Sequence, residues 1–247
     1  SASKPLALET RKKLTKEQHQ SFKNISDAMI KKEPIVLNGI TGSGKTELYM
    51  QVIERNLKKK EQALVLVPEI GLTPQLLGEF RSRFGNTIAV IHSENTPKEN
   101  AVNWVKAKNG LSKIIIGTRS SIFTPFQSLG LIVVDEEHDA SYKQQSGLRY
   151  SARDLSLVRA ANNGISVILG SATPSFETLM NVEKKKYRQT VLKKRVFSNS
   201  LPSTQMIDLR VHPQERGLTK ILINEIKKQL DNKKQSLIYL NRRGYSP

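Results

Sequence analysis

The 247-residue sequence contains no cysteine, which excludes disulfides and thiolate metal sites. Its four histidines are scattered, which argues against a zinc site. No run of about 18 apolar residues occurs, so we expect no membrane-spanning helix. No export signal is visible either, and we expect a cytoplasmic protein.

Acidic residues are also scarce, with 22 Asp and Glu against 40 Lys and Arg, which gives a formal net charge of +18. A surplus of this size repels itself and usually serves binding to a polyanion, such as nucleic acid or a membrane surface. The densest basic stretch, residues 182–195, lacks the apolar aromatic face that a membrane-surface helix carries. We therefore expect nucleic acid as a partner and no membrane binding.

Short aliphatic runs alternate with amphipathic segments along the first 170 residues. Each run is too short for a helix, and most are rich in branched residues, which is typical of buried parallel strands. The predicted strands are residues 34–38, 63–67, 88–91, 113–116, 131–134 and 166–169. The predicted helices include residues 46–60, 73–84, 97–108 and 151–162. This alternation predicts an α/β domain with a mostly parallel, doubly wound sheet flanked by helices.

Five of these predicted strands run directly into polar or glycine-containing segments. The segments read GITGSGKT, PEIGLTPQ, GTRSS, DEEHD and GSATPS. Because the carboxyl ends of parallel strands meet at one edge of a sheet, we expect these segments to converge on one crevice. Polar βα loops occur in any such fold, but the chemistry of these five favours a shared site.

The segment from Gly39 to Thr46 fits the phosphate-binding pattern G-x-x-x-x-G-K-[ST] between a predicted strand and a predicted helix. Its glycines let backbone N–H groups curl around phosphate oxygens, which assigns Gly42, Ser43 and Gly44 to nucleotide binding. Lys45 is placed to reach the β and γ phosphates, and Thr46 to ligate Mg²⁺.

The segment LIVVDEEHD, residues 131–139, supplies the second half of a hydrolase. Asp135 ends a strand and would hold Mg²⁺, while Glu136 would polarise the attacking water as a general base. An acidic cluster that merely caps a strand is the alternative. It is disfavoured because two adjacent buried carboxylates without a cation are costly.

The motif series resembles that of superfamily 2 helicases, and within them the PriA family of bacterial replication-restart helicases. The matching strings are TGSGKTELY, LVLVPEIGLTPQ, GTRSSIF, DEEHDASYKQQ, RYSARD, LGSATPS and the terminal NRRGYSP, from about Leu14 to Pro247. The resemblance implies a RecA-like P-loop fold, ATP as substrate and Mg²⁺ as cofactor. It also implies single-stranded and forked DNA, single-strand-binding protein and primosome proteins as partners in a bacterial cytoplasm, near the nucleoid.

Site roles follow from the resemblance at matching positions. Gln18, upstream of the phosphate loop, would recognise adenine. Residues in three further segments would grip the backbone of single-stranded DNA or couple that grip to the nucleotide: Thr73, Gln75, Thr118, Arg119, Ser120, Ser171 and Thr173. Hydroxyl, amide and guanidinium donors at loop and helix starts suit phosphates, although several of these residues could equally cap helices.

Residues 139–154 resemble the aromatic, basic loop with which PriA and RecQ-type helicases couple single-strand binding to hydrolysis. Tyr142 and Tyr150 would offer stacking faces, while Lys143, Arg149 and Arg153 would offer charge, a combination that suits single strands. A flexible charged loop with incidental tyrosines is the alternative.

The composition shifts after about residue 181, because residues 181–247 carry 16 Lys and Arg against 5 Asp and Glu. We predict an ATP-binding lobe over residues 1–205 and the start of a second lobe over 206–247, with a helix at 218–234 and a strand at 235–241. The resemblance implies a fragment, because the family continues with a zinc module, whose ligands are absent from this chain, and with an arginine finger. The fragment alone should therefore hydrolyse ATP weakly.

The sequence thus predicts the ATP-binding lobe of a helicase that translocates on single-stranded DNA in replication restart. A P-loop kinase or GTPase would share the phosphate loop, but it has no need of DEEH, GSAT or the basic surplus. For the fragment alone, a nucleotide-gated DNA-binding module with little hydrolysis is the remaining alternative.

Overall fold

The computed structural model describes residues 11–196, 203–215 and 217–239, so the terminal NRRGYSP at 241–247 lies outside the described residues. The chain divides into two compact units, Ser1–Asn199 and Ser200–Pro247. Within the described ranges, no helix is both long and apolar enough to cross a membrane.

The first unit is built on a seven-stranded sheet with the strand order β3-β4-β2-β5-β8-β1-β9. All neighbouring strands in it are parallel. The strands are β1 (Ile35–Gly39), β2 (Gln62–Leu66), β3 (Ile88–Ile91), β4 (Ile114–Gly117), β5 (Leu129–Val134), β8 (Ser166–Ser171) and β9 (Arg188–Leu192). Parallel order requires a crossover between consecutive strands, and helices make most of these crossovers.

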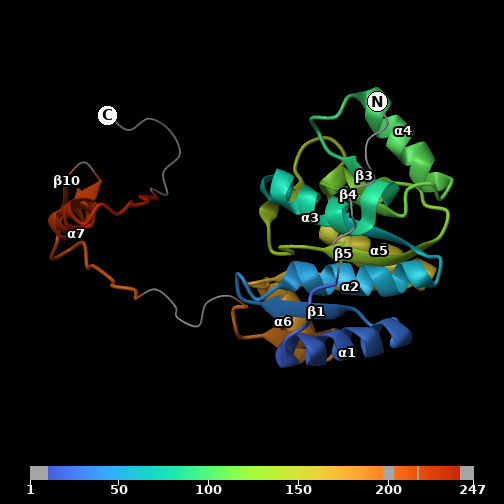
Figure 1. The fold of residues 1–247 in the computed structure, drawn as a ribbon, viewed down its shortest axis with the longest axis horizontal. Coiled ribbons are helices and arrows are strands. Elements are labelled where there is room, and N and C mark those ends of the chain that lie inside the picture. The colour runs from blue at the N-terminus through green and yellow to red at the C-terminus, as the bar shows by residue number, and fades with distance from the viewer. Residues whose placement is uncertain (1–10, 197–202, 216, 240–247) are drawn as a thin grey trace. The chain divides into compact units, whose positions relative to one another are not determined.

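Helices cover both faces of this sheet (Figure 1). One face packs against α1 (Lys16–Lys31), α2 (Lys45–Lys58) and α3 (Pro74–Phe84), and the other against α4 (Pro97–Lys108) and α5 (Ala152–Asn163). A further helix, α6 (Phe176–Glu183), follows β8. The predicted doubly wound α/β architecture is therefore confirmed.

Side chains that alternate along each strand explain the two layers of core. Leu37, Val65 and Val133 point into the cluster beneath α1 and α2, whereas Val36 and Leu64 point into the cluster beneath α4 and α5. All five are at most 2% exposed, so the strands are buried on both faces, as parallel strands usually are.

Local signals set the helix starts that matter for the site. Thr15 and Gln18 form a reciprocal capping box at the start of α1, and Thr96 and Glu99 form another at α4. Ser151 caps α5 through a hydrogen bond from the Asp154 backbone N–H. Each cap stabilises one helix start and so fixes where the preceding loop ends.

All six predicted strands exist, within one or two residues of the predicted bounds. The sequence pattern did not predict α1, α6 or β9. The edge strand β9 lies inside the basic stretch 182–195 and pairs with β1. Only Thr190 and Leu192 of β9 are buried, so its alternating pattern is short and the surrounding lysines obscure it.

The second unit contains a two-stranded hairpin, β10 (Gln214–Glu215) with β11 (Leu218–Thr219), and α7 (Lys220–Asp231). The predicted helix is present, but the predicted strand at 235–241 is wrong over the described residues 235–239, which have no regular structure. Leu237 and Tyr239 are 99% and 83% exposed. A strand needs a hydrogen-bonding neighbour, and residues 235–239 have none among the described strands.

Candidate functional site

The five polar segments meet at the carboxyl edge of five adjacent strands, β4, β2, β5, β8 and β1. Backbone hydrogen bonds join neighbouring segments: Val67 donates to Gly117 O (3.0 Å), Asp135 to Leu66 O (2.9 Å), and Glu137 to Gly170 O (3.0 Å). The predicted convergence is therefore confirmed.

The phosphate loop has the backbone conformation that its glycines permit. Gly42 and Gly44 have φ angles of 78° and 82°, which side chains rarely adopt. Between them, Ser43 is 1% exposed, and its Oγ has no hydrogen-bond partner. A buried polar atom without a partner is costly, so this hydroxyl is available to a bound group. These features fit a bound phosphate.

Gln18 is buried against this loop rather than exposed. Its Nε2 donates to Ser43 O at 2.9 Å, and its Oε1 accepts from the Thr15 backbone N–H at 2.9 Å. A Cβ added to Gly44 would overlap the Gln18 amide nitrogen, so Gly44 is required by contact as well as by its φ angle. The predicted adenine contact stays a prediction.

Asp135 is held from two sides at the end of β5. The Tyr49 hydroxyl donates to Asp135 Oδ1 at 2.9 Å, and the Tyr142 hydroxyl donates to Asp135 O at 2.6 Å. Burial raises the pKa of the Asp135 carboxyl, the hydrogen bond from Tyr49 opposes this, and the charge of Glu136 raises it further. A cation near Asp135 would offset that cost.

Lys45 is such a cation, since its charge acts to lower the pKa of Asp135. Its Nζ donates to Gly39 O at 2.9 Å and lies 3.4 Å from Glu136 Oε1. Glu136 has a φ of 46°, in the left-handed region that a glutamate seldom occupies and that costs about 1–3 kcal/mol. The turn thus aims the Glu136 carboxylate at the phosphate loop.

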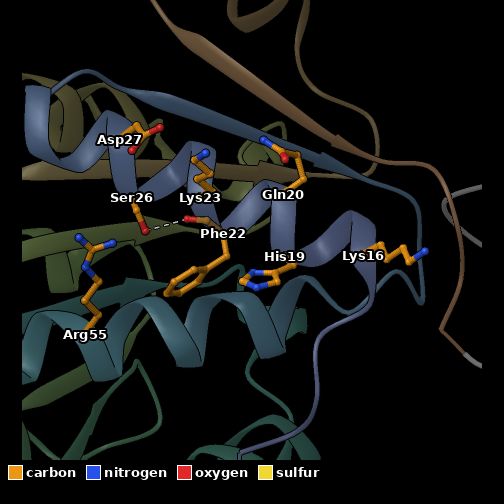
Figure 2. A pocket seen from close by; sticks show the side chains of 8 residues that line it. All are labelled: Lys16, His19, Gln20, Phe22, Lys23, Ser26, Asp27 and Arg55. Carbon is orange, nitrogen blue, oxygen red and sulfur yellow. Dashed lines mark hydrogen bonds between the residues drawn. The ribbon is translucent and has the colours of Figure 1, made fainter.

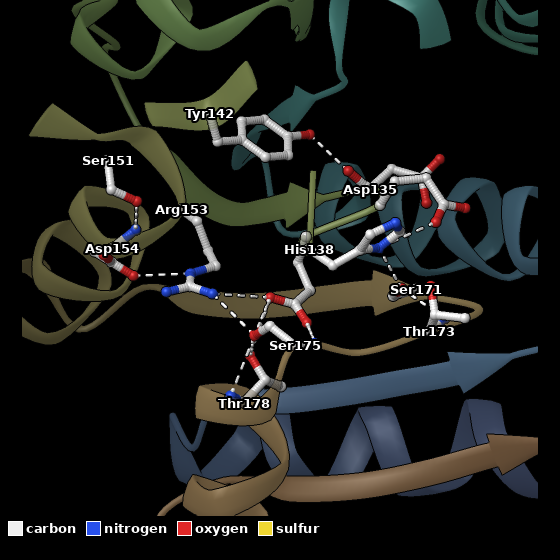
Figure 3. A network of polar contacts seen from close by, with 12 residues as sticks. Asp135, His138, Tyr142, Ser151, Arg153, Asp154, Ser171, Thr173, Ser175 and Thr178 are labelled. Carbon is white, nitrogen blue, oxygen red and sulfur yellow. Dashed lines mark hydrogen bonds and ion pairs between the residues drawn. The ribbon is translucent and has the colours of Figure 1, made fainter. Parts of the chain in front are cut away.

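Glu137, which the sequence pattern did not single out, contacts Arg153 and Ser175, whose side chains are labelled in Figure 3. Its carboxylate accepts from Ser175 N (2.7 Å), Ser175 Oγ (3.2 Å) and Thr178 Oγ1 (3.0 Å). Arg153 Nη1 lies 3.3 Å from the same carboxylate. Glu137 is 1% exposed, and these partners satisfy it. A glutamate following two predicted site carboxylates was the signal that could have revealed it.

Arg153 is therefore engaged inside the protein. It donates to Asp154 at 2.8 Å and to Ser175 Oγ at 3.0 Å, besides pairing with Glu137. Although burial acts to lower it, the pKa of Arg153 is raised by Asp154 and Glu137. Its predicted role in DNA contact is untested, and in this structure it ties the loop at 139–154 to Glu137.

Tyr142 does not present the expected stacking face, because it is 2% exposed and supports Asp135 instead. Tyr150 is half-buried and packs edge-to-face on Phe123, with ring centroids 4.9 Å apart. Strands β6 (Lys143–Gln144) and β7 (Tyr150–Ser151) form a small hairpin in which Lys143 and Arg149 are exposed. Lys143 and Arg149 of this loop thus face solvent, while its aromatic rings mostly do not.

The GTRSS segment contacts this loop directly. Arg119 Nη1 donates to Ser141 O at 2.8 Å and to Lys143 O at 3.1 Å. Thr118 is buried and Ser120 exposed. On α3, Thr73 caps the helix through Leu76 N (3.2 Å), and Gln75 is exposed. The DNA contacts predicted for these residues stay predictions.

Ser171 joins the GSAT and DEEH segments. Its Oγ lies 2.7 Å from His138 Nδ1 and accepts from the Thr173 backbone N–H at 2.9 Å (Figure 3). His138 Nδ1 is also 3.6 Å from Glu136 Oε2. A chain of contacts therefore runs from Lys45 through Glu136 and His138 to Ser171, which suits the coupling predicted for Ser171 and Thr173.

A shallow hollow elsewhere belongs to α1 and α2 alone (Figure 2). Its lining is Lys16, His19, Gln20, Phe22, Lys23, Ser26, Asp27 and Arg55. None of these residues comes from the five segments. The hollow therefore lies apart from the chemistry described above.

The described residues able to hold Mg²⁺ are too few to form a site from protein ligands alone, as is usual where the ion binds together with a nucleotide. Over the described residues there is no group of three or more His, Cys, Asp and Glu side chains that could hold an ion. Mg²⁺ is usually bound by one or two protein oxygens together with substrate phosphates and water. Thr46 and Asp135 suit that arrangement.

The DEAD/DEAH box helicase family matches residues 15–182 of this chain. The chain belongs to that family. It is also similar to the replication restart protein PriA of Haemophilus influenzae, with 50% identity over 212 residues, and of Bacillus subtilis, with 40% identity over 238 residues. These alignments cover 86% and 94% of this chain but only 29% and 30% of the relatives. The resemblance to PriA is thus confirmed, and the chain spans about a third of the length of the relatives it matches.

Two solved structures share the fold. The match to RecG bound to a three-way DNA junction covers 76% of this chain and 25% of the RecG chain, with a TM-score of 0.56 and 23% identity. The match to the Hef helicase domain of Pyrococcus furiosus covers 72% of this chain and 38% of the Hef chain, with a TM-score of 0.50 and 20% identity. At these identities the likeness supports the fold.

In this DEAD/DEAH box helicase chain, replacing Glu137 should destabilise the fold much more than replacing its neighbour Glu136. Glu137→Ala should lower the free energy of unfolding by about 3–5 kcal/mol, because it leaves Arg153 and two hydroxyls without their buried partner. Glu136→Ala, the matched control, should cost less than about 1 kcal/mol, because its ion pair is partly exposed. Urea unfolding followed by circular dichroism measures both. Equal costs would contradict the anchoring role of Glu137.

Gly170→Ala should destabilise the fold because the added methyl group would collide with the Tyr49 hydroxyl. An added Cβ would overlap the Tyr49 hydroxyl oxygen, and overpacking of this kind costs about 1–3 kcal/mol. In a Tyr49→Phe background the cost of Gly170→Ala should shrink. A double-mutant cycle of urea unfolding measures this coupling. Additive costs would mean that the Tyr49 hydroxyl is not what Gly170 accommodates.

Proposed function

We propose that this chain is the ATP-binding lobe of a DNA helicase that hydrolyses ATP and translocates on single-stranded DNA during replication restart. The observation that carries the proposal is the placement of Lys45 between the phosphate loop and Glu136, at 3.4 Å from that carboxylate. The family match and the similarity to PriA support the same reading.

In the proposed reaction, Lys45 moves its ammonium group from Glu136 to the β and γ phosphates of ATP. Backbone N–H groups of Gly42, Ser43 and Gly44 bind phosphate oxygens, and Gln18 binds the adenine. Glu136, released from Lys45, orients and deprotonates the attacking water, with Asp135 beside it. Such catalysis is mostly positioning and charge stabilisation.

When bound, Mg²⁺ would supply positive charge to the phosphate oxygens. Thr46 and Asp135 are the residues that would hold it, Asp135 through water. The hydrogen bond from Tyr49 keeps the Asp135 carboxylate oriented for that task.

DNA would bind over the segments that lie beside the nucleotide crevice. Lys143 and Arg149 are exposed on the β6–β7 hairpin, and Arg119 holds the base of that loop. Thr73, Gln75 and Ser120 are candidates for contacts to the DNA backbone, because all three are exposed. Forked DNA, single-strand-binding protein, primosome proteins and a location in the bacterial cytoplasm belong to the same proposal.

A nucleotide-gated DNA-binding module with little hydrolysis is the second candidate. The exposed basic hairpin favours it, because binding needs that charge even where turnover is absent. Hydrolysis separates the two candidates.

The test compares Lys45→Ala and Glu136→Gln with the unaltered chain in MgADP binding and in ATP hydrolysis with and without single-stranded DNA. Lys45→Ala should lose nucleotide binding. Glu136→Gln should keep binding and lose at least about 100-fold in turnover, the range of general base catalysis. DNA should stimulate the hydrolysis that the unaltered chain performs.

If Glu136→Gln left the rate of ATP hydrolysis unchanged, Glu136 would not be the general base. Binding of MgADP and DNA by an unaltered chain that hydrolyses no ATP would favour the binding module.

A further inference from the structure

The stretch that follows the edge strand β9 lies across the phosphate loop. We call residues 193–196, which read KKRV, the strap. Leu192 O accepts from Ile40 N at 3.2 Å, and Val196 N donates to Gly42 O at 2.9 Å. Two residues of the loop are therefore hydrogen-bonded to a segment more than 150 positions away in sequence.

The start of α1 holds the strap from the other side. The Glu17 carboxylate accepts the backbone N–H groups of Lys193 (2.9 Å) and Lys194 (3.2 Å). Their side chains are exposed. Arg195 is the basic residue that turns toward the loop.

Arg195 lies against Gly42. A Cβ built on Gly42 would be 3.8 Å from Arg195 Cγ and 3.9 Å from Cδ, which is ordinary van der Waals contact. Its Nε is buried and has no hydrogen-bond partner. No carboxylate of the described residues forms an ion pair with its guanidinium group.

Glu17 of α1, which contacts the strap, already accepts two of its backbone N–H groups. Leaving a buried donor of a charged group without a partner is costly. A bound anion would remove that cost.

A second polar atom without a partner lies in the phosphate loop itself. Ser43 Oγ, next to Gly42, is buried and likewise has no hydrogen-bond partner. A hydroxyl of the loop and a guanidinium donor of the strap, which packs on the adjacent Gly42, thus both lack partners. Arg is suited to this place, since its planar fork binds phosphate oxygens in pairs.

We propose that Arg195 binds the phosphate chain of the nucleotide held by the loop. This rests on the proposed function and adds to it a binding residue from outside the five segments. The strap would thus be a wall of the nucleotide site, with Val196 setting the position of Arg195 through its hydrogen bond to Gly42.

The test is the affinity of the whole chain for MgADP by calorimetry. Arg195→Gln should weaken binding by about tenfold or more, the size of one charge-assisted hydrogen bond. Arg195→Lys should recover part of that loss. Lys194→Gln, the matched control on the adjacent exposed cation, should stay within about twofold, as an exposed charge contributes little. The loss in Arg195→Gln should shrink as salt is raised.

Thermal unfolding excludes a merely structural role. Because Arg195 Nε has no partner within the ligand-free protein, Arg195→Gln should not lower the melting temperature of the ligand-free chain and should reduce the rise caused by MgADP. A clear fall in the ligand-free melting temperature would overturn the proposal. So would MgADP affinity equal to that of the unaltered chain, or a loss that salt does not change.

Lys45→Ala separates this inference from the proposed function. If Lys45→Ala abolishes MgADP binding while Arg195→Gln leaves it unchanged, only the role of Arg195 fails. If the unaltered chain does not bind MgADP, the proposed function fails with it.

Discussion

Two adjacent carboxylates at the end of a buried strand are the constraint on which the site depends. Asp135 and Glu136 follow β5 at the centre of the sheet, where desolvation raises the pKa of Asp135. Lys45 supplies the neutralising charge, and it can do so because α2 starts at the end of the neighbouring phosphate loop. Removing Lys45 would leave the buried Asp135 carboxylate without that neighbouring positive charge.

The three acidic residues 135–137 have different surroundings and therefore different roles. Asp135 is fixed by two tyrosine hydroxyls, Glu136 is turned toward Lys45 by a left-handed backbone, and Glu137 is buried among hydroxyls and Arg153. Only Glu137 has a full set of internal partners. Asp135 and Glu136 can therefore contact a bound ligand, whereas Glu137 links their segment to the loop at 139–154 through Arg153.

Much of the fold could be predicted, because buried parallel strands are short aliphatic runs and their polar carboxyl ends must share an edge. Glycine spacing likewise predicted the phosphate loop. Tertiary contacts could not be predicted: Tyr49 reads as a helix residue until its hydroxyl is found on Asp135. Tyr142 reads as a stacking residue until it proves buried. Arg195 lies in a basic stretch, and no local pattern places it on Gly42.

The strand predicted at 235–241 is wrong over residues 235–239 for the same physical reason. Its aliphatic residues match the pattern of β1 or β4, but pattern alone cannot supply a neighbouring strand. Segments of the central sheet succeed where this one fails because their neighbours are present in the described chain.

The most direct measurement is a crystal structure of the chain with MgADP and beryllium fluoride. We expect Lys45 Nζ to leave Glu136 and to lie about 2.7–3.2 Å from phosphate or fluoride atoms, with the Glu136 carboxylate facing a water. A nucleotide bound away from the loop, or a Lys45 still paired with Glu136, would contradict the account.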